Sequence, residues 1–220
     1  MTEARVQRQV FTTSRLLEFC SQKELVLQTG HPVEQWPLVV LKELMDTALD
    51  ACEEADVAPA IKVEVRDGSI TVTDNGPGLA PETVDSLLEF SVRVSSREAY
   101  VSPTRGAQGN ALKTLVAMPF ALDGASGTTT IEARGVRHLI KFSVDNLRQT
   151  PRVDRSEEPS NVKTGTSITV HLASPKVAEA RSRFLQIASD YTRLNPHLSL
   201  EIAWEADRWV IKAIDPAWRK

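Results

Sequence analysis

The chain has 220 residues, and its 26 basic and 29 acidic side chains give a formal net charge of −3. This balance excludes a global basic field, so any contact with nucleic acid would need a local patch or another subunit. The two cysteines give no disulfide framework, and there is neither an apolar leader nor a run of 18 apolar residues. We therefore expect a cytoplasmic protein with no membrane partner.

The first 33 residues are polar and mixed, and we expect them to form an N-terminal arm. We expect residues 34–220 to form a single domain, because this length can bury one sizeable hydrophobic core.

Residues 34–57 have the periodicity of an amphipathic helix, with Pro37 in the first turn and Pro59 just beyond the end. Taken alone, this pattern is typical of an ordinary helix with a solvated acidic face. The apolar side carries Leu41, Leu44, Met45, Ala48 and Cys52. The polar side carries Glu43, Thr47, Asp50 and Glu54.

Two alternating runs, 61–65 and 70–72, flank Asp67-Gly68 and predict a β-hairpin. The second strand delivers Asp74 into a turn that holds Gly76 and Gly78. A carboxylate fixed at a strand end can accept a hydrogen bond from an exocyclic amine, and glycines let a flat ligand approach the backbone. The DNGPG turn alone is a weak signal, because its dipeptides are common in turns.

Residues 104–113, TRGAQGNALK, form a glycine-containing loop that opens a second apolar helix. Free N–H groups and the positive end of a helix dipole suit an anion there, and Lys113 lies one turn into the helix. The loop matches neither the Walker A pattern nor a GxGxxG turn after a parallel strand. Residues 91–108 are rich in serine and arginine, which suits a mobile lid.

The remaining pattern predicts a two-layer α/β sandwich, with helices on one face of a mixed, mostly antiparallel sheet. The expected elements are a short helix over 81–90, a hairpin over 128–144, a loop over 145–164, a strand over 166–172, a helix over 175–194, and strands over 198–204 and 209–214.

The order of these pieces resembles the Bergerat-fold (GHKL) ATPases, the superfamily of gyrase, chaperone, histidine-kinase and mismatch-repair proteins. The closer resemblance is to the nucleotide-binding domain of the ATPase (B) subunit of DNA topoisomerase VI. It rests on KELMDTALDACEEADVAPAIKVEV, VRVSSREAYVSPTRGAQG, the Gly165-Thr166 pair and LNPHLSLEI, and it covers roughly residues 10–205. A transducer domain follows in that family, and we expect none within these 220 residues.

The resemblance implies an ATP site. Glu43 would be the general base that polarises the attacking water, and Asp50 would support the adenine side of the pocket. Asp74 would accept the adenine amino group, Gly76 and Gly78 would shape the base pocket, and the Thr166 hydroxyl would close it.

The resemblance also implies how the phosphates and Mg²⁺ are held. Lys113 would add positive charge at the phosphates. The metal would lie at Thr47, where family members usually carry an asparagine ligand. The phosphates would be wrapped by backbone groups of Gly106, Ala107, Gln108, Gly109, Asn110 and Ala111.

Three functions stay open. The first is an ATP-hydrolysing module of a type IIB topoisomerase, in which ATP drives homodimerisation and gates DNA for a DNA-cleaving partner subunit. The second is a nucleotide-dependent clamp with little or no hydrolysis, because Thr47 replaces asparagine and Ala111 replaces the third lid glycine. The third is a histidine-kinase-like catalytic domain, which is disfavoured because no helix with a phosphoacceptor histidine precedes it. The N-terminal arm either reaches a second protomer, as in related ATPases, or packs on its own domain.

Overall fold

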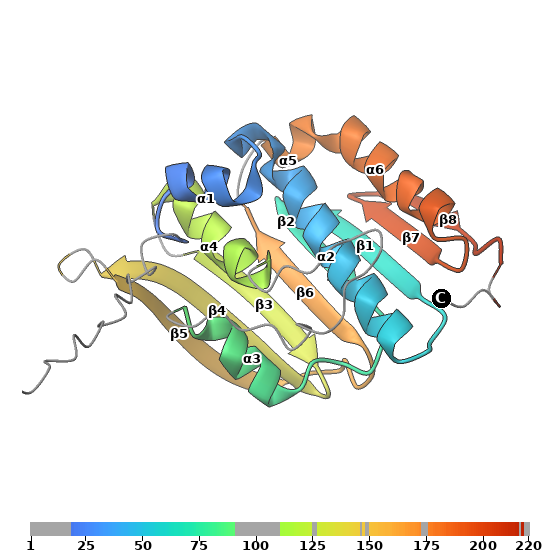
Figure 1. The fold of residues 1–220 in the computed structure, drawn as a ribbon, viewed down its shortest axis with the longest axis horizontal. Coiled ribbons are helices and arrows are strands. Elements are labelled where there is room, and N and C mark those ends of the chain that lie inside the picture. Colours follow the sequence, from blue (N-terminus) through green and yellow to red (C-terminus); the bar gives the residue numbers. More distant parts are fainter. Residues whose placement is uncertain are drawn as a thin grey trace, which may run out of the picture.

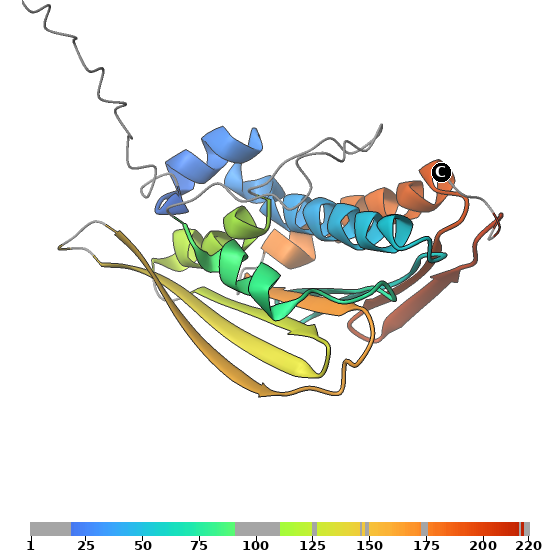
Figure 2. The same cartoon turned by 60° about the horizontal axis from the view of Figure 1, so that its bottom comes forward.

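The computed structural model describes residues 19–90, 111–124, 127–145, 147, 150–172, 176–215 and 217. These residues form one sheet with helices over a single face (Figures 1 and 2). The helices are α1 (Gln22–Thr29), the 3-10 helix η2 (Val33–Gln35), α2 (Trp36–Glu54), α3 (Pro81–Leu88), α4 (Ala111–Asp123), α5 (Lys176–Glu179) and α6 (Arg181–Leu194). The strands are β1 (Ala60–Arg66), β2 (Ser69–Thr73), β3 (Gly127–Ala133), β4 (Val136–Asp145), β5 (Thr150–Pro159), β6 (Thr166–His171), β7 (Ser199–Trp204) and β8 (Asp207–Ile211).

The described strands lie in the order β5-β4-β3-β6-β2-β1-β7-β8. Every neighbouring pair among them is antiparallel except β1 and β7, which run parallel. The predicted fold class, a mixed and mostly antiparallel sheet with helices on one face, is confirmed.

Alternation along the strands separates the core from the uncovered face of the sheet. On β1, Ile61, Val63 and Val65 are buried against the helix layer. On the opposite face the hydroxyl groups of Thr71 and Thr169 lie 2.9 Å apart across β2 and β6. A sheet with one buried and one polar face has this period-two pattern.

Helix α2 lies across the middle of the helix layer (Figure 1). Its predicted apolar side is buried in full, and Trp36 at its first turn has no exposed surface. Fixing α2 on the sheet also fixes the opposite side of the helix, which carries the predicted acidic residues.

The prediction of a loop over 145–164 is wrong, because residues Thr150–Pro159 form β5. This strand pairs with β4 from Asp145↔Thr150 to Val136↔Pro159 and lies at the sheet edge. Most of its side chains are exposed, so its sequence lacks the apolar alternation that marks a half-buried strand. Prolines at its two ends are compatible with an edge strand.

The predicted helix over 175–194 consists of two helices, because α5 ends at Glu179 and α6 begins at Arg181. The intervening Ala180 accepts a hydrogen bond from the N–H of Phe184 and donates one to Lys176. The last predicted strand ends at Ile211 and not at residue 214.

The described part of the N-terminal arm packs on its own domain. Leu25 of α1 is fully buried, and Gln22 donates a hydrogen bond to the carbonyl of Leu122 in α4. The ring of Phe19 meets Phe90 edge-on, with centroids 5.1 Å apart. Residues 1–18 lie outside the described part. Within that part, no helix combines the length and the apolar character needed to cross a membrane.

Candidate functional site

Two of the predicted pieces meet where β2 and β6 lie side by side. The turn that begins at Asp74 follows β2, and the Gly165-Thr166 pair opens β6. The N–H of Asp74 donates to the carbonyl of Thr166 over 2.9 Å, and the N–H of Gly165 donates to the carbonyl of Gly76 over 2.9 Å. Residues separated by about ninety positions in sequence therefore form one backbone unit.

The Asp74 carboxylate is held by backbone donors inside this unit. Its Oδ1 accepts hydrogen bonds from the N–H of Gly76 at 2.8 Å and of Thr166 at 3.2 Å. Only 8% of Asp74 is exposed. Hydrogen bonds of this kind fix the orientation of a carboxylate. Such a group can accept a hydrogen bond from a ligand without reorganising.

Two glycines of this unit occupy backbone conformations that side chains rarely adopt. Gly165 has φ +72°, and a Cβ there would lie 1.8 Å from the carbonyl oxygen of Asp74. Gly78 has φ +79°, and its Cβ would lie 2.9 Å from the carbonyl oxygen of Gly165. The close approach of the two segments therefore requires glycine at both positions. At Gly76, a Cβ would lie 3.0 Å from Asp74 Oδ1.

The Thr166 side chain closes the same turn from β6. Its hydroxyl oxygen accepts a hydrogen bond from the N–H of Leu79 over 3.2 Å, and the residue is 4% exposed. Arg134, between β3 and β4, donates through Nε to the carbonyl of Gly78 at 3.2 Å. The predicted residues of the turn are therefore brought together, with Arg134 as an additional support.

Asn75 is a residue that sequence reasoning missed. Its Oδ1 accepts hydrogen bonds from the N–H of Ala60 at 2.8 Å and from Cys52 Sγ at 3.3 Å, and its Nδ2 donates to the carbonyl of Ala58 at 3.1 Å. Asn75 thus ties the turn to the end of α2 and the start of β1. The sequence signal was the asparagine of DNGPG, which also fits a generic turn.

Cys52 is buried beside this unit at the end of α2. Burial, together with the smaller effect of the negative charge of Asp74, raises the pKa of its thiol to about 12. The thiol therefore stays neutral near pH 7 and donates to Asn75. It is a small core group, as its place on the apolar side of α2 predicted.

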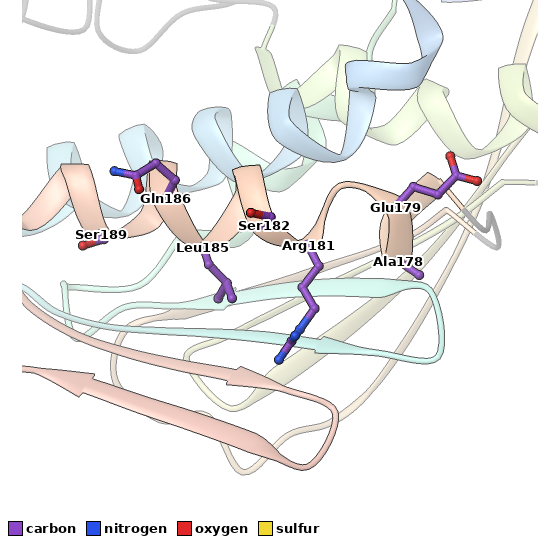
Figure 3. Close-up of a pocket in the computed structure, with 7 residues that line it drawn as sticks. All are labelled: Ala178, Glu179, Arg181, Ser182, Leu185, Gln186 and Ser189. Carbon is purple, nitrogen blue, oxygen red and sulfur yellow. The ribbon is translucent and has the colours of Figure 1, made fainter.

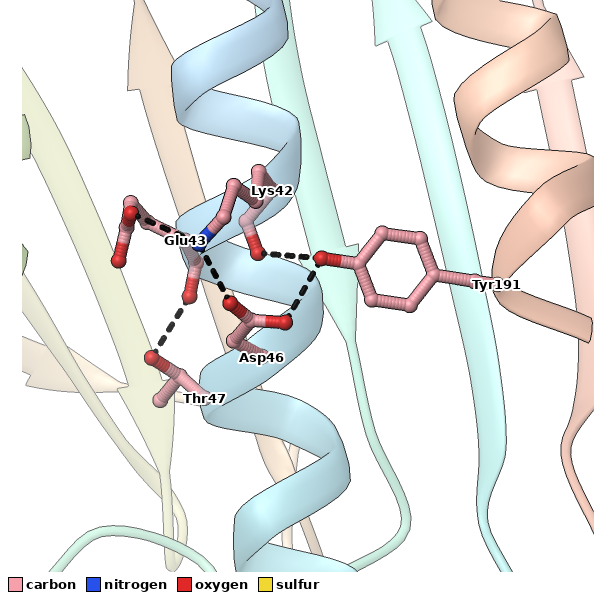
Figure 4. A network of polar contacts seen from close by, with 5 residues as sticks. All are labelled: Lys42, Glu43, Asp46, Thr47 and Tyr191. Atoms are coloured by element: carbon pink, nitrogen blue, oxygen red, sulfur yellow. Dashed lines mark hydrogen bonds and ion pairs between the residues drawn. The ribbon is translucent and has the colours of Figure 1, made fainter. Parts of the chain in front are cut away.

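The polar side of α2 presents the predicted Glu43, Thr47 and Asp50 (Figure 4 shows the first two). The Glu43 side chain is 22% exposed, so solvent reaches its carboxylate. Asp50, at 8% exposure, is more deeply set. An accessible carboxylate on a rigid helix has the chemistry required of a general base.

Thr47 offers an incomplete donor set for a magnesium ion. Its hydroxyl donates to the carbonyl of Glu43 over 2.8 Å, which commits the proton and leaves oxygen lone pairs for a cation. Among the described residues, no cluster of three or more histidine, cysteine, aspartate or glutamate side chains could hold a metal. Mg²⁺ is commonly held by one or two protein oxygens, with phosphate oxygens and water completing the shell. Thr47 fits one such position.

Lys113, in the first turn of α4, is 1% exposed. Its ammonium donates a hydrogen bond to the carbonyl of Glu89 over 2.7 Å. Burial lowers the pKa of this ammonium, and the Glu89 carboxylate offsets part of the shift. Lys113 therefore joins the residues just before and just after segment 91–110, and its role at phosphate stays a prediction.

The predicted phosphate loop lies outside the described part of the chain. This applies to Gly106, Ala107, Gln108, Gly109 and Asn110, and to the predicted lid. Ala111 is the first residue of α4.

A shallow surface depression of about 580 Å³ lies elsewhere, along α5 and α6 (Figure 3). It contains none of the predicted site residues. Arg181 on its rim forms an ion pair with Asp207 at 2.5 Å and lies over the Trp209 ring at 5.6 Å. The side chain thus packs against β8, and the depression has no chemistry that suggests a site.

Comparison with known families gives a match, over residues 33–176, to a family described as histidine kinase-, DNA gyrase B-, and HSP90-like ATPase. This segment includes α2, the Asp74 turn and the Gly165-Thr166 pair.

Among curated proteins, the chain is similar to the B subunit of type 2 DNA topoisomerase 6 from two organisms. It is 26% identical over 190 residues to the Archaeoglobus fulgidus protein, across 83% of this chain and 31% of that protein. It is 29% identical over 178 residues to the Natronomonas pharaonis protein, across 74% of this chain and 21% of that protein. The chain spans about a third or less of the length of these relatives.

Among solved structures, the Aquifex aeolicus MutL ATPase domain complexed with ADP has a TM-score of 0.47 and 19% identity. That match covers 83% of this chain and 64% of the other.

Proposed function

Because the chain belongs to the family of histidine kinase-, DNA gyrase B- and HSP90-like ATPases, we propose that it binds and hydrolyses ATP. The observation that supports this most strongly is the Asp74 carboxylate, which two backbone N–H groups hold at the end of β2. A carboxylate held in a fixed orientation beside the glycine turn suits the amino group of adenine. In this proposal the chain is the ATPase module of a topoisomerase VI B-like protein.

In this proposal the Asp74 turn and Thr166 bind the adenine base, α2 supplies the general base and a metal ligand, and the segment that leads into α4 binds the phosphates. Asp74 accepts the adenine amino group, with Gly76 and Gly78 shaping the base pocket and Thr166 closing it. Asp50 supports the adenine side. Glu43 polarises the attacking water, and Thr47 supplies one ligand to Mg²⁺. The phosphates are wrapped by Gly106, Ala107, Gln108, Gly109, Asn110 and Ala111, with Lys113 adding positive charge.

We further propose that ATP binding drives two copies of the chain together and gates DNA for a DNA-cleaving partner subunit. The support is the similarity to proteins named as the B subunit of type 2 DNA topoisomerase 6. Dimerisation would appear in sedimentation as an ATP-dependent doubling of mass. A test of DNA gating needs the full assembly with the DNA-cleaving subunit.

The test of nucleotide binding is calorimetric titration with a non-hydrolysable ATP analogue, with and without Mg²⁺. Asp74→Asn should weaken binding at least about tenfold, because it removes the charged acceptor. Asp154→Asn on exposed β5 makes the same chemical change away from the site and should leave the affinity unchanged. Equal affinities for all three proteins would exclude Asp74 from the pocket.

The test of hydrolysis is Glu43→Ala. Phosphate release should be lost while analogue binding is retained, because the general base contributes to the transition state and not to ground-state affinity. Unchanged turnover in this variant would remove Glu43 from its role.

A second candidate function, a nucleotide-dependent clamp with little or no hydrolysis, is favoured by Thr47. Its hydroxyl already donates to the Glu43 carbonyl, and a hydroxyl oxygen is a weaker ligand for Mg²⁺ than the amide oxygen of the asparagine that family members usually carry. Tight binding of Mg²⁺–ATP without phosphate release, in the full assembly as well, would select the clamp.

A further inference from the structure

A lysine links the proposed general base to a second carboxylate on α2 (Figure 4). Lys42 Nζ lies 3.2 Å from Glu43 Oε1 and 2.8 Å from Asp46 Oδ2. Burial lowers the pKa of Lys42, but the bonds to the two carboxylates outweigh it, so the pKa is raised. The cation between them is therefore held in its charged form.

A tyrosine from a different helix fixes the second carboxylate. Tyr191 on α6 donates its hydroxyl proton to Asp46 Oδ1 over 2.7 Å, and the same hydroxyl oxygen lies 3.3 Å from the Lys42 carbonyl. Asp46 is only 8% exposed, so water does not compete freely for its oxygens. Figure 4 shows the Tyr191 ring reaching from α6 to this point on α2.

The contact with Asp46, rather than the contact with Glu43, fixes the position of the Lys42 ammonium. An exposed lysine–carboxylate pair alone contributes little, because both side chains are flexible and solvated. The Lys42–Asp46 contact is shorter than the Lys42–Glu43 contact, and Asp46 is buried and anchored by Tyr191. Half of the Lys42 side chain is exposed, but its ammonium is tethered from the Asp46 side at a position next to the Glu43 carboxylate.

We propose that Tyr191 is a positioning residue for the general base Glu43. It orients Asp46, which anchors Lys42, and the anchored ammonium sets the orientation of the Glu43 carboxylate toward the attacking water. The inference rests on the proposed ATPase function. A misplacement of about 1 Å at a reacting group can reduce a rate by about a hundredfold, so weak contacts that fix orientation matter to turnover.

The experiment measures single-turnover hydrolysis of labelled ATP with the protein in excess, together with calorimetric affinity for the ATP analogue. Tyr191→Phe removes only the hydroxyl, and it should lower the hydrolysis rate by about five- to tenfold with affinity unchanged. Lys42→Gln should lower the rate further. Lys42→Arg should stay within about threefold of the original rate, because its guanidinium can reach both carboxylates.

The double variant gives the sharpest readout. If Tyr191 acts through Lys42, adding Tyr191→Phe to Lys42→Gln should slow hydrolysis no further. Independent structural effects would multiply instead. Lys176→Gln is the matched control, because Lys176 forms a 2.9 Å pair with Glu34 away from Glu43, and it should leave hydrolysis unchanged.

The outcomes separate this inference from the proposed function. Hydrolysis at the original rate in Tyr191→Phe would overturn the inference and leave the ATPase proposal intact. Loss of affinity in parallel with rate would also overturn it, because that pattern indicates a damaged fold. Absence of hydrolysis in the unaltered protein would refute the ATPase proposal, and the inference would fall with it.

Discussion

Lys113 Nζ and the carbonyl oxygen of Glu89 lie 2.7 Å apart and join α4 to the end of α3. The two residues flank segment 91–110, so this partly buried hydrogen bond links the chain just before that segment to the chain just after it. A lysine with 1% exposure costs desolvation free energy, which its lowered pKa reflects.

Because of Lys113, the stability of the protein should depend on pH in the alkaline range. The unfolded chain titrates Lys113 near its usual pKa of 10.5, and the folded chain titrates it at a lower pH. Between these two values the unfolded state binds more protons, so the contribution of Lys113 to stability rises as pH rises. Lys113→Met should abolish this rise in the free energy of unfolding, which is measured by urea unfolding at pH values from about 8 to 10.5. Identical pH slopes for the two proteins would contradict it.

Cys52 should act in the opposite direction. Its folded pKa is raised from the usual 9.0 to about 12, so its contribution is fully present below pH 9 and is lost as pH rises toward 12. Cys52→Ala should flatten this fall in the free energy of unfolding. In a Cys20→Ala background, Cys52 should resist alkylation at mildly alkaline pH until the chain unfolds. Rapid alkylation of the native protein would contradict the neutral, buried thiol.

Gly165→Ala should destabilise the protein by at least about 2 kcal/mol and abolish nucleotide binding. The cause is the added Cβ, which would lie 1.8 Å from the Asp74 carbonyl oxygen and must push the two segments apart. Gly30→Ala is the matched control, because Gly30 has a similar φ of +68° with nothing within 4 Å of its Cβ. It should cost about 1 kcal/mol and leave binding unchanged. Equal losses of stability in the two variants would show that the positive φ alone, and not the contact with Asp74, causes the effect.

Thr47→Val should remove the strengthening of analogue binding by Mg²⁺, because it keeps the shape of the side chain and deletes its oxygen. Thr47→Asn should increase that strengthening, since an amide oxygen is a stronger ligand than a hydroxyl that already serves the helix backbone. Calorimetry with and without Mg²⁺ measures both. A Mg²⁺ effect that survives in Thr47→Val would place the metal on other ligands.

The sequence predicted the elements in which contact with the core requires regularly spaced apolar residues. Helix α2 and strands β1 and β2 bury regularly spaced apolar residues, so their periodicity is visible in the sequence. Strand β5 is held by backbone pairing to β4 at an exposed edge, and backbone hydrogen bonds leave no trace in side-chain pattern. The break at Ala180 likewise escapes a periodicity that continues from α5 into α6.

At the candidate site, motifs singled out the Asp74 turn and Thr166, and the structure brings the two into contact. They did not reveal that Lys113 is buried and bonded to the Glu89 carbonyl, because the sequence does not indicate where a lysine side chain points. They also missed Tyr191, because its contact with Asp46 spans 145 positions and arises only when α6 packs on α2.

The parallel pairing of β1 with β7 has a consequence for how the protein reaches its native state. Residues 60–65 of β1 find their partners at 199–204, so one side of β1 has no native partner while most of the chain is still being synthesised. Contacts between such distant segments slow folding, and an unpaired strand edge invites association with other chains. The nascent protein is therefore vulnerable to aggregation at β1 until β7 has emerged, and a chaperone that shields β1 would raise the yield of folded protein.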